Sequence, residues 1–197
     1  PTQRQYMNAR PAQSPYRCTP LMIHTLDQLT KDITNVDIED ILSSWQWRVS
    51  GMKAVVTISC LGDIYLLGYD NNIYWLQTDS GDLTKIANSL DEYLTLLRKE
   101  ENIDNWFLPL LVEKLVAAGK TLKEHEVYSY KKLPIIGGEY SVDNIDPTDM
   151  SIHFALSGQI CEQIKDLPDG TIVNINFESK TAAYNIGFFQ DGRQNKS

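Results

Sequence analysis

The hydrophobic positions in the first half of the chain predict two short helices followed by a β-meander. Apolar residues recur at helical spacing over residues 26–36, after a capping-box pattern, and again over residues 37–44. Three strand-like runs follow at residues 52–60, 64–69 and 73–78. Short turns containing glycine, aspartate or asparagine separate these runs, so we expect a three-stranded antiparallel sheet.

In the second half of the chain, the pattern predicts helices before it returns to extended segments. A capping box at Ser89 begins a helix that ends near residue 100, and a second helix is expected over residues 109–118. Residues 126–131 form a short extended segment, and a loop follows between Gly137 and Pro147. These elements are expected to cover the sheet.

The last part of the pattern predicts two more strands separated by a helix. Apolar residues occupy every second position from 150 to 156, which is the strand period and places His153 on the solvent face. A helix is expected to begin at Ser157, and residues 171–177 alternate again as a final strand. The whole order predicts an α+β fold, with an antiparallel β-meander sheet flanked by helices in a single domain.

Charge is unevenly distributed and divides the chain into three parts. The 197 residues carry a net charge of −8, but residues 1–21 carry +3 and residues 179–197 carry +2, so that residues 22–178 carry −13. We expect an irregular or disordered arm at 1–21, one α+β domain at 22–178 and a polar tail at 179–197. An acidic body disfavours nucleic acid and anionic membrane as partners.

Composition and cysteine usage predict a cytoplasmic protein. Hydrophobic residues make up 42% of the chain and charged residues 22%, which excludes wholesale disorder. No apolar run has the length of a membrane span, and the N-terminus lacks the pattern of a secretory signal. Cys18, Cys60 and Cys161 are odd in number and form no CxxC pair, so we expect buried, unpaired thiols.

No motif predicts catalysis, a cofactor or a bound metal. The chain lacks a nucleophile elbow, a phosphate-binding glycine loop and histidines at zinc spacing. The alternative is a small hydrolase or metal enzyme that uses His125, His153 and Cys161. Because three such residues are scattered in most chains, we predict a non-enzymatic protein with no catalytic residue and no metal ligand.

Two aromatic pairs are candidates for surface anchors. Trp45 and Trp47 form the first pair, and Trp106 and Phe107 form the second. We expect one ring of each pair in the core, while the other is either core or an anchor for a partner. The acidity of the body likewise has two interpretations, solubility or the capture of a basic protein.

Three stretches, taken in order, resemble one protein family. The first runs through residues 60–65, 73–76 and 81–83 and contains Leu61-Gly62-Asp63; the second is 105–109; the third runs from 128 to 145 and continues at 157–170. Together they resemble bacterial proteins with the C-terminal domain of type VI secretion DNase-immunity proteins, a domain similar to the SUKH immunity group. The resemblance covers about residues 22–177. It implies a SUKH-like α+β fold without catalysis or cofactor, and a cytoplasmic protein that neutralises a cognate toxin by tight binding.

The segment from residue 139 to residue 146 is the candidate partner-binding surface. It is loop-like and contains three acids and one amphipathic ring: Glu139, Tyr140, Asp143 and Asp146. We expect it to bind a secreted, basic toxin, with a nuclease as one option, and the protein to be a monomer or a heterodimer with that toxin. The alternatives are a solvated loop that covers the sheet, and a regulatory adaptor of the same fold that binds another protein.

Overall fold

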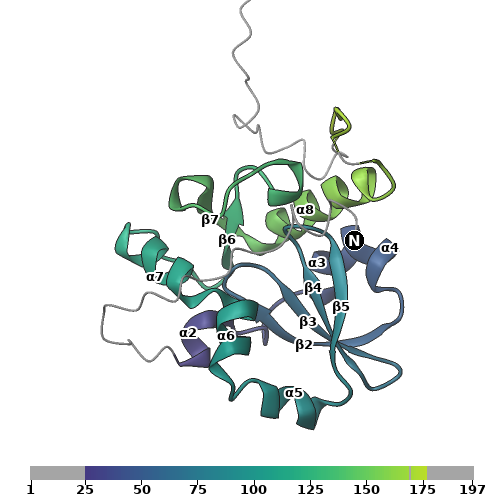
Figure 1. The fold of residues 1–197 in the computed structure, drawn as a ribbon, viewed down its shortest axis with the longest axis vertical. Helices are drawn as coiled ribbons and strands as arrows, with labels where there is room; N and C mark the ends of the chain where they lie inside the picture. Colours follow the sequence, from purple (N-terminus) through teal and green to yellow (C-terminus); the bar gives the residue numbers. More distant parts are fainter. Residues whose placement is uncertain (1–24, 169, 177–197) are drawn as a thin grey trace, which may run out of the picture.

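The computed structural model describes residues 25–168 and 170–176 (Figure 1). The expected arm at 1–21 and the expected tail at 179–197 lie outside the described residues. The expected division of the chain at residues 21 and 178 therefore stays a prediction.

An antiparallel five-stranded sheet forms the centre of the fold. Its strands follow one another in chain order, as β1 (Thr30–Lys31), β2 (Met52–Ser59), β3 (Ile64–Gly68), β4 (Ile73–Gln77) and β5 (Asp82–Ala87). The predicted meander is confirmed as β2–β4, and the sheet is wider than predicted by one strand on each side. Gly62 and Asn71 lie in the left-handed region, at φ 81° and 64°, and make the two tight turns of the meander.

Helices and the second sheet surround this meander. In Figure 1, the second sheet, β6 (Glu126–Tyr130) and β7 (Ile145–Asp149), lies above the first together with α8 (Met150–Ile164). Helix α5 (Leu90–Leu96) lies below the first sheet, and α6 (Glu100–Phe107) and α7 (Pro109–Ala117) lie on its left. Three consecutive residues of β3, Ile64 to Leu66, are each 0% exposed. A strand that is buried on both faces has to be covered on both faces, which explains why β3 is an unbroken apolar run.

Short helices lie before and after the meander, and side-chain caps begin two of them, α3 (Ile38–Leu42) and α5. The helices are α2 (Leu26–Leu29), α3 (Ile38–Leu42), η1 (Ser43–Trp45), α4 (Gln46–Val49), α5 (Leu90–Leu96), α6 (Glu100–Phe107) and α7 (Pro109–Ala117). The Ser89 hydroxyl accepts a hydrogen bond from the backbone N–H of Glu92 at 3.1 Å, and the Asp37 carboxylate caps α3 in the same way. The helix predicted over 26–36 is wrong beyond Leu29, because Thr30 instead pairs with Ser59 in the sheet.

The predicted strand at 150–156 is wrong, because these residues begin α8 (Met150–Ile164). Two antiparallel strands, β6 (Glu126–Tyr130) and β7 (Ile145–Asp149), precede this helix as a second sheet. The Asp149 carboxylate accepts from the backbone N–H of Ser151 at 2.9 Å and so caps the helix. The inward residues lie at helical spacing, three, four and seven positions after Met150, and are His153, Phe154 and Ser157. The apolar residues of this stretch fit both the strand period and the helical period, and the Asp149 cap favours the helix.

The final strand predicted over residues 171–177 is also not found. Residues 171–176 form no strand, and Phe177 lies outside the described residues. Ile172 is 97% exposed, whereas Val173 and Ile175 pack against the core. The alternation therefore identifies the buried side of this segment correctly, although the segment pairs with no strand among the described residues.

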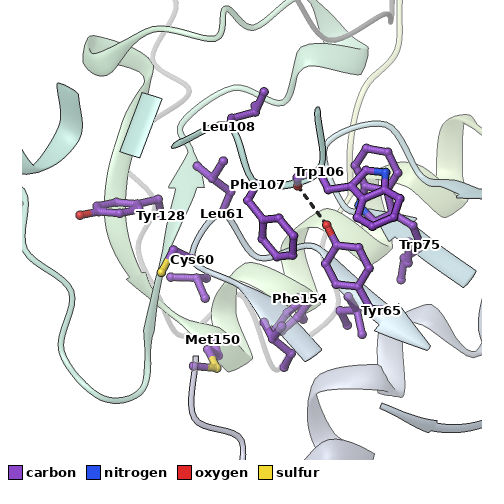
Figure 2. Packing of buried hydrophobic residues seen from close by; sticks show 14 of the residues in the cluster. Cys60, Leu61, Tyr65, Trp75, Trp106, Phe107, Leu108, Tyr128, Met150 and Phe154 are labelled. Carbon is purple, nitrogen blue, oxygen red and sulfur yellow. Dashed lines mark hydrogen bonds between the residues drawn. The ribbon is translucent and has the colours of Figure 1, made fainter. Parts of the chain in front are cut away.

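An aromatic cluster joins the sheet to α6 (Figure 2). Tyr65 of β3 lies against Trp75 of β4, with ring centroids 6.3 Å apart, and against Phe107, at 5.2 Å. Its hydroxyl donates to the backbone carbonyl of Trp106 at 3.0 Å, so the buried phenol is satisfied. Trp106 and Phe107 are 5% and 1% exposed, so both rings of this pair belong to the core.

Candidate functional site

The predicted binding segment is a closed loop that returns the chain from β6 to β7. Residues 139–141 are irregular, η3 (Val142–Asn144) follows, and Asp146 is already in β7. The side-chain amide of Asn144 donates to the carbonyls of Lys132 and Glu139, at 2.9 and 2.8 Å. Its carbonyl oxygen accepts from the Lys132 backbone N–H at 3.1 Å. One buttressing side chain thus holds the two sides of the loop together.

Gly138 makes this closure possible. A Cβ at this position would lie 1.7 Å from the backbone oxygen of Lys132, so only glycine fits. The paired glycines at 137 and 138 are therefore explained by the turn.

The four predicted residues of this loop have different environments. Glu139 and Asp143 are exposed, whereas Tyr140 and Asp146 are half-buried. The Tyr140 hydroxyl donates to the carboxylate of Asp79 at 2.8 Å, and its ring meets Tyr130 edge-on at 5.5 Å. Tyr140 therefore fastens the loop to the turn after β4, and Glu139 and Asp143 are the two exposed carboxylates of the loop.

Asp146 is held in a salt bridge with two lysines. Its oxygens lie 2.7 Å from Lys120 Nζ and 3.0 Å from Lys131 Nζ. Partial burial alone would raise the pKa of Asp146, but the hydrogen bonds from the two lysines outweigh this and hold the pKa below its usual value. Lys120 also donates to the backbone carbonyls of Val142 and Ile145. The negative charge of Asp146 is therefore largely neutralised by the chain itself.

The three residues of the enzymatic alternative do not form a site. His125 is exposed in a turn, and its backbone carbonyl accepts from Met150. Cys161 is buried under Gly81, and burial strongly raises the pKa of its thiol. Within residues 25–168 and 170–176, no three His, Cys, Asp or Glu side chains are placed to hold a metal ion. A metal site of His125, His153 and Cys161 is therefore wrong for this fold.

The position of His153 in the structure differs most from the position that the sequence pattern predicts. This residue is 1% exposed and joins α8 to both sheets, instead of lying on a solvent face. Its Nδ1 lies 2.9 Å from the Ser129 hydroxyl of β6, and its Nε2 lies 3.1 Å from the Thr78 hydroxyl after β4. Burial lowers the pKa of His153 to about 4, although a hydrogen bond to the Gly62 backbone opposes the shift. The ring is therefore neutral near pH 7.

The Leu61-Gly62-Asp63 turn is the second half of this buried network. The Asp63 carboxylate, 1% exposed, accepts from the Thr78 backbone N–H at 3.0 Å and from the Trp75 indole N–H at 3.2 Å. A Cβ on Gly62 would lie 2.2 Å from His153 Nε2. The sequence gives no direct signal for this network, because Thr78 and His153 are 75 positions apart. The turn that carries part of the family resemblance thus has a packing role.

Both cysteines in the described part of the chain are free, buried thiols, as predicted. Burial raises the pKa of Cys60 to about 11, with Lys31 opposing the shift. Cys18 lies outside the described residues. These thiols are protonated at neutral pH and are poor nucleophiles.

The comparisons with known proteins indicate the class to which this geometry corresponds. Residues 87–161 match the family described as T6SS immunity protein Tdi1, C-terminal. This region contains α5 to α7, both strands of the second sheet, the 139–146 loop and His153. The chain thus resembles the C-terminal domain of a type VI secretion immunity protein, as the sequence motifs predict.

Other comparisons add little to this assignment. No curated protein matches the sequence significantly. Among solved structures, the chain is similar to Atu4351 from Agrobacterium tumefaciens, with 19% identity and a TM-score of 0.43. That similarity covers 61% of this chain and 63% of the other, which is less than two thirds of its length. In the part of this chain that the structure describes, no helix is long and apolar enough to span a membrane.

Proposed function

We propose that this chain is an immunity protein that binds and neutralises a cognate toxin delivered by type VI secretion. The observation that carries this proposal is the match of residues 87–161 to an immunity-protein domain. In the structure this region shares one hydrophobic core with the meander, so the matched domain and the meander fold as one unit. Neutralisation is by binding alone, without catalysis or a cofactor.

The proposed toxin-binding surface is centred on the 139–146 loop. Its support is the exposure of Glu139 and Asp143 on a loop that Asn144 and Tyr140 hold rigid. A rigid loop binds with little loss of conformational entropy, and exposed acids attract a basic partner. The proposed partner is therefore a basic toxin, a nuclease among the options, that forms a heterodimer with this protein. The buried thiols favour action in the cytoplasm of the producing cell.

Growth protection tests this proposal directly. The product of the gene adjacent to this one, which the proposal expects to be the toxin, is expressed in a sensitive bacterium, with or without this chain, under separate control. The expected result is that the toxin alone stops growth and that this chain restores it. A matched control is a noncognate immunity protein of similar charge, which should give no protection. Growth arrest that persists at full expression of this chain contradicts the proposal and favours an adaptor for another protein.

A further inference from the structure

The structure separates the two tryptophans at 45 and 47 into a core residue and a surface residue. Trp45 is 0% exposed, whereas Trp47 is half-buried and stacks on Trp45, with ring centroids 5.8 Å apart. The indole N–H of Trp47 already donates to the backbone carbonyl of Ser44 at 3.1 Å. What Trp47 offers to a partner is therefore its ring, held rigidly by Trp45.

Two cations lie over this ring, one from α4 and one from the residue that follows α8. The Arg48 guanidinium of α4 is 5.7 Å from the ring centroid, and the Lys165 ammonium, directly after α8, is 5.1 Å from it. Both side chains belong to exposed residues. No carboxylate among residues 25–168 and 170–176 is within ion-pair distance of either cation. We call Trp47, Arg48 and Lys165 the Trp47 platform.

The Trp47 platform and the 139–146 loop pack against the same turn. This turn, residues 78–81, follows β4. A Cβ on Gly81 would lie 3.9 Å from Trp47 Cη2, and Asp79 accepts the hydrogen bond from Tyr140. The buried turn therefore links the positively charged Trp47 platform to the negatively charged 139–146 loop. A partner protein that reaches across this turn meets both charges.

We infer that the Trp47 platform is a second contact surface for the toxin and that it receives a toxin carboxylate between Arg48 and Lys165. The inference rests on the proposed function and specifies how the toxin is oriented. Both cations contact the Trp47 ring, and no carboxylate in the described part of the chain pairs with either, so a toxin carboxylate complements their charge. Tryptophan and arginine dominate the binding energy of many interfaces, which matches the composition of the Trp47 platform. The toxin then presents basic groups to Glu139 and Asp143 and one acid to the platform.

Affinity measurements with matched charge variants test this inference. The probe is the purified product of the adjacent gene, the toxin expected under the proposed function. The Arg48→Gln, Lys165→Gln double variant should bind it about tenfold more weakly or worse, mainly through faster dissociation. The control is Lys53→Gln, Lys85→Gln, which removes the same charge from exposed lysines of β2 and β5 and should change affinity less than about twofold. The Arg48→Lys variant keeps both positive charges of the platform, so its affinity for the toxin should fall less than that of the double variant.

Each outcome separates this inference from the proposed function. Melting temperatures of all variants are measured first, and they should stay within a few degrees because the altered side chains are exposed. If the unaltered chain binds tightly and the platform variant binds equally well, the platform inference is wrong and the immunity function stands. If the unaltered chain does not bind the toxin, both fail.

Discussion

At the scale of single residues, the buried imidazole of His153 makes the stability of the fold depend on pH. Its pKa is about 4 in the folded protein, against 6.5 for an ordinary histidine. The unfolded chain therefore takes up a proton more readily, and the free energy of unfolding falls as pH drops from about 6.5 to about 4. The full loss from this group is on the order of 3 kcal/mol.

Urea unfolding at several pH values between 7.5 and 4.5 measures this effect. The chain should lose more stability over this range than a His153→Gln variant, which has no titratable group at position 153. Acidic residues contribute equally to both proteins, so the difference between the two slopes belongs to His153. Parallel slopes would show that the imidazole is not buried as described.

Gly62 and Gly119 form a matched pair for testing the contact between the Leu61-Gly62-Asp63 turn and His153. Both glycines have left-handed backbone, with φ of 81° and 78°. A Cβ on Gly62 meets the His153 ring at 2.2 Å, whereas a Cβ on Gly119 meets nothing within 4 Å. Gly119→Ala should cost about 1 kcal/mol of stability from backbone strain alone. Gly62→Ala should cost about 3 kcal/mol or more, because the clash is added. Equal losses in calorimetry would contradict this packing.

At the scale of elements, the sequence predicts local structure well where caps and turns accompany the hydrophobic period. Ser89 and Pro109 locate the beginnings of α5 and α7, and Asn71 locates a hairpin. The pattern fails at residues 150–156, where the apolar side chains fit both periods and Asp149 decides for a helix. It also misses β1, because a strand of two residues exists only through its pairing with β2.

Prediction of the candidate site from the sequence is also limited to features that are local in the chain. Sequence identifies the loop and its acids, because an irregular acidic segment can be read locally. It does not distinguish Asp146, which Lys120 and Lys131 neutralise, from Asp143, which is exposed, since those lysines are 26 and 15 positions away. It also cannot show that Tyr140 bonds to Asp79, 61 positions earlier. Contacts of this kind are set by the fold, and only the structure shows them.

The exposed acids of the 139–146 loop should speed toxin association through long-range attraction. Glu139→Gln combined with Asp143→Asn should slow association several-fold at low salt and have little effect above about 0.5 M salt, where charges are screened. The control is Asp27→Asn with Glu124→Gln, which removes two exposed acids from α2 and from the turn before β6. Surface-based binding kinetics measures the association rate of each double variant with the purified toxin. An equal slowing in the control would mean that overall charge steers the toxin and that this loop has no special role.

At the scale of the whole molecule, the body is expected to fold without the N-terminal arm. Residues 1–21 carry four of the eight prolines and three arginines, and they lack an apolar period. A chain that begins at Met22 should therefore melt within a few degrees of the full chain, and as cooperatively. The measurement is differential scanning calorimetry of both proteins. A broad or strongly lowered transition would show that the arm belongs to the core.

Neutralisation by this chain is expected to occur through stoichiometric binding of the toxin. The most direct measurement is a titration of this protein into a fixed concentration of the purified cognate toxin, well above the dissociation constant, with toxin activity as the readout. Tight binding without catalysis predicts that activity falls linearly and reaches zero at one molecule of this protein per toxin molecule. Complete and lasting inactivation by a small fraction of an equivalent would show that this chain acts as an enzyme, and full activity at excess would show that it does not neutralise this toxin. Either result would contradict the account.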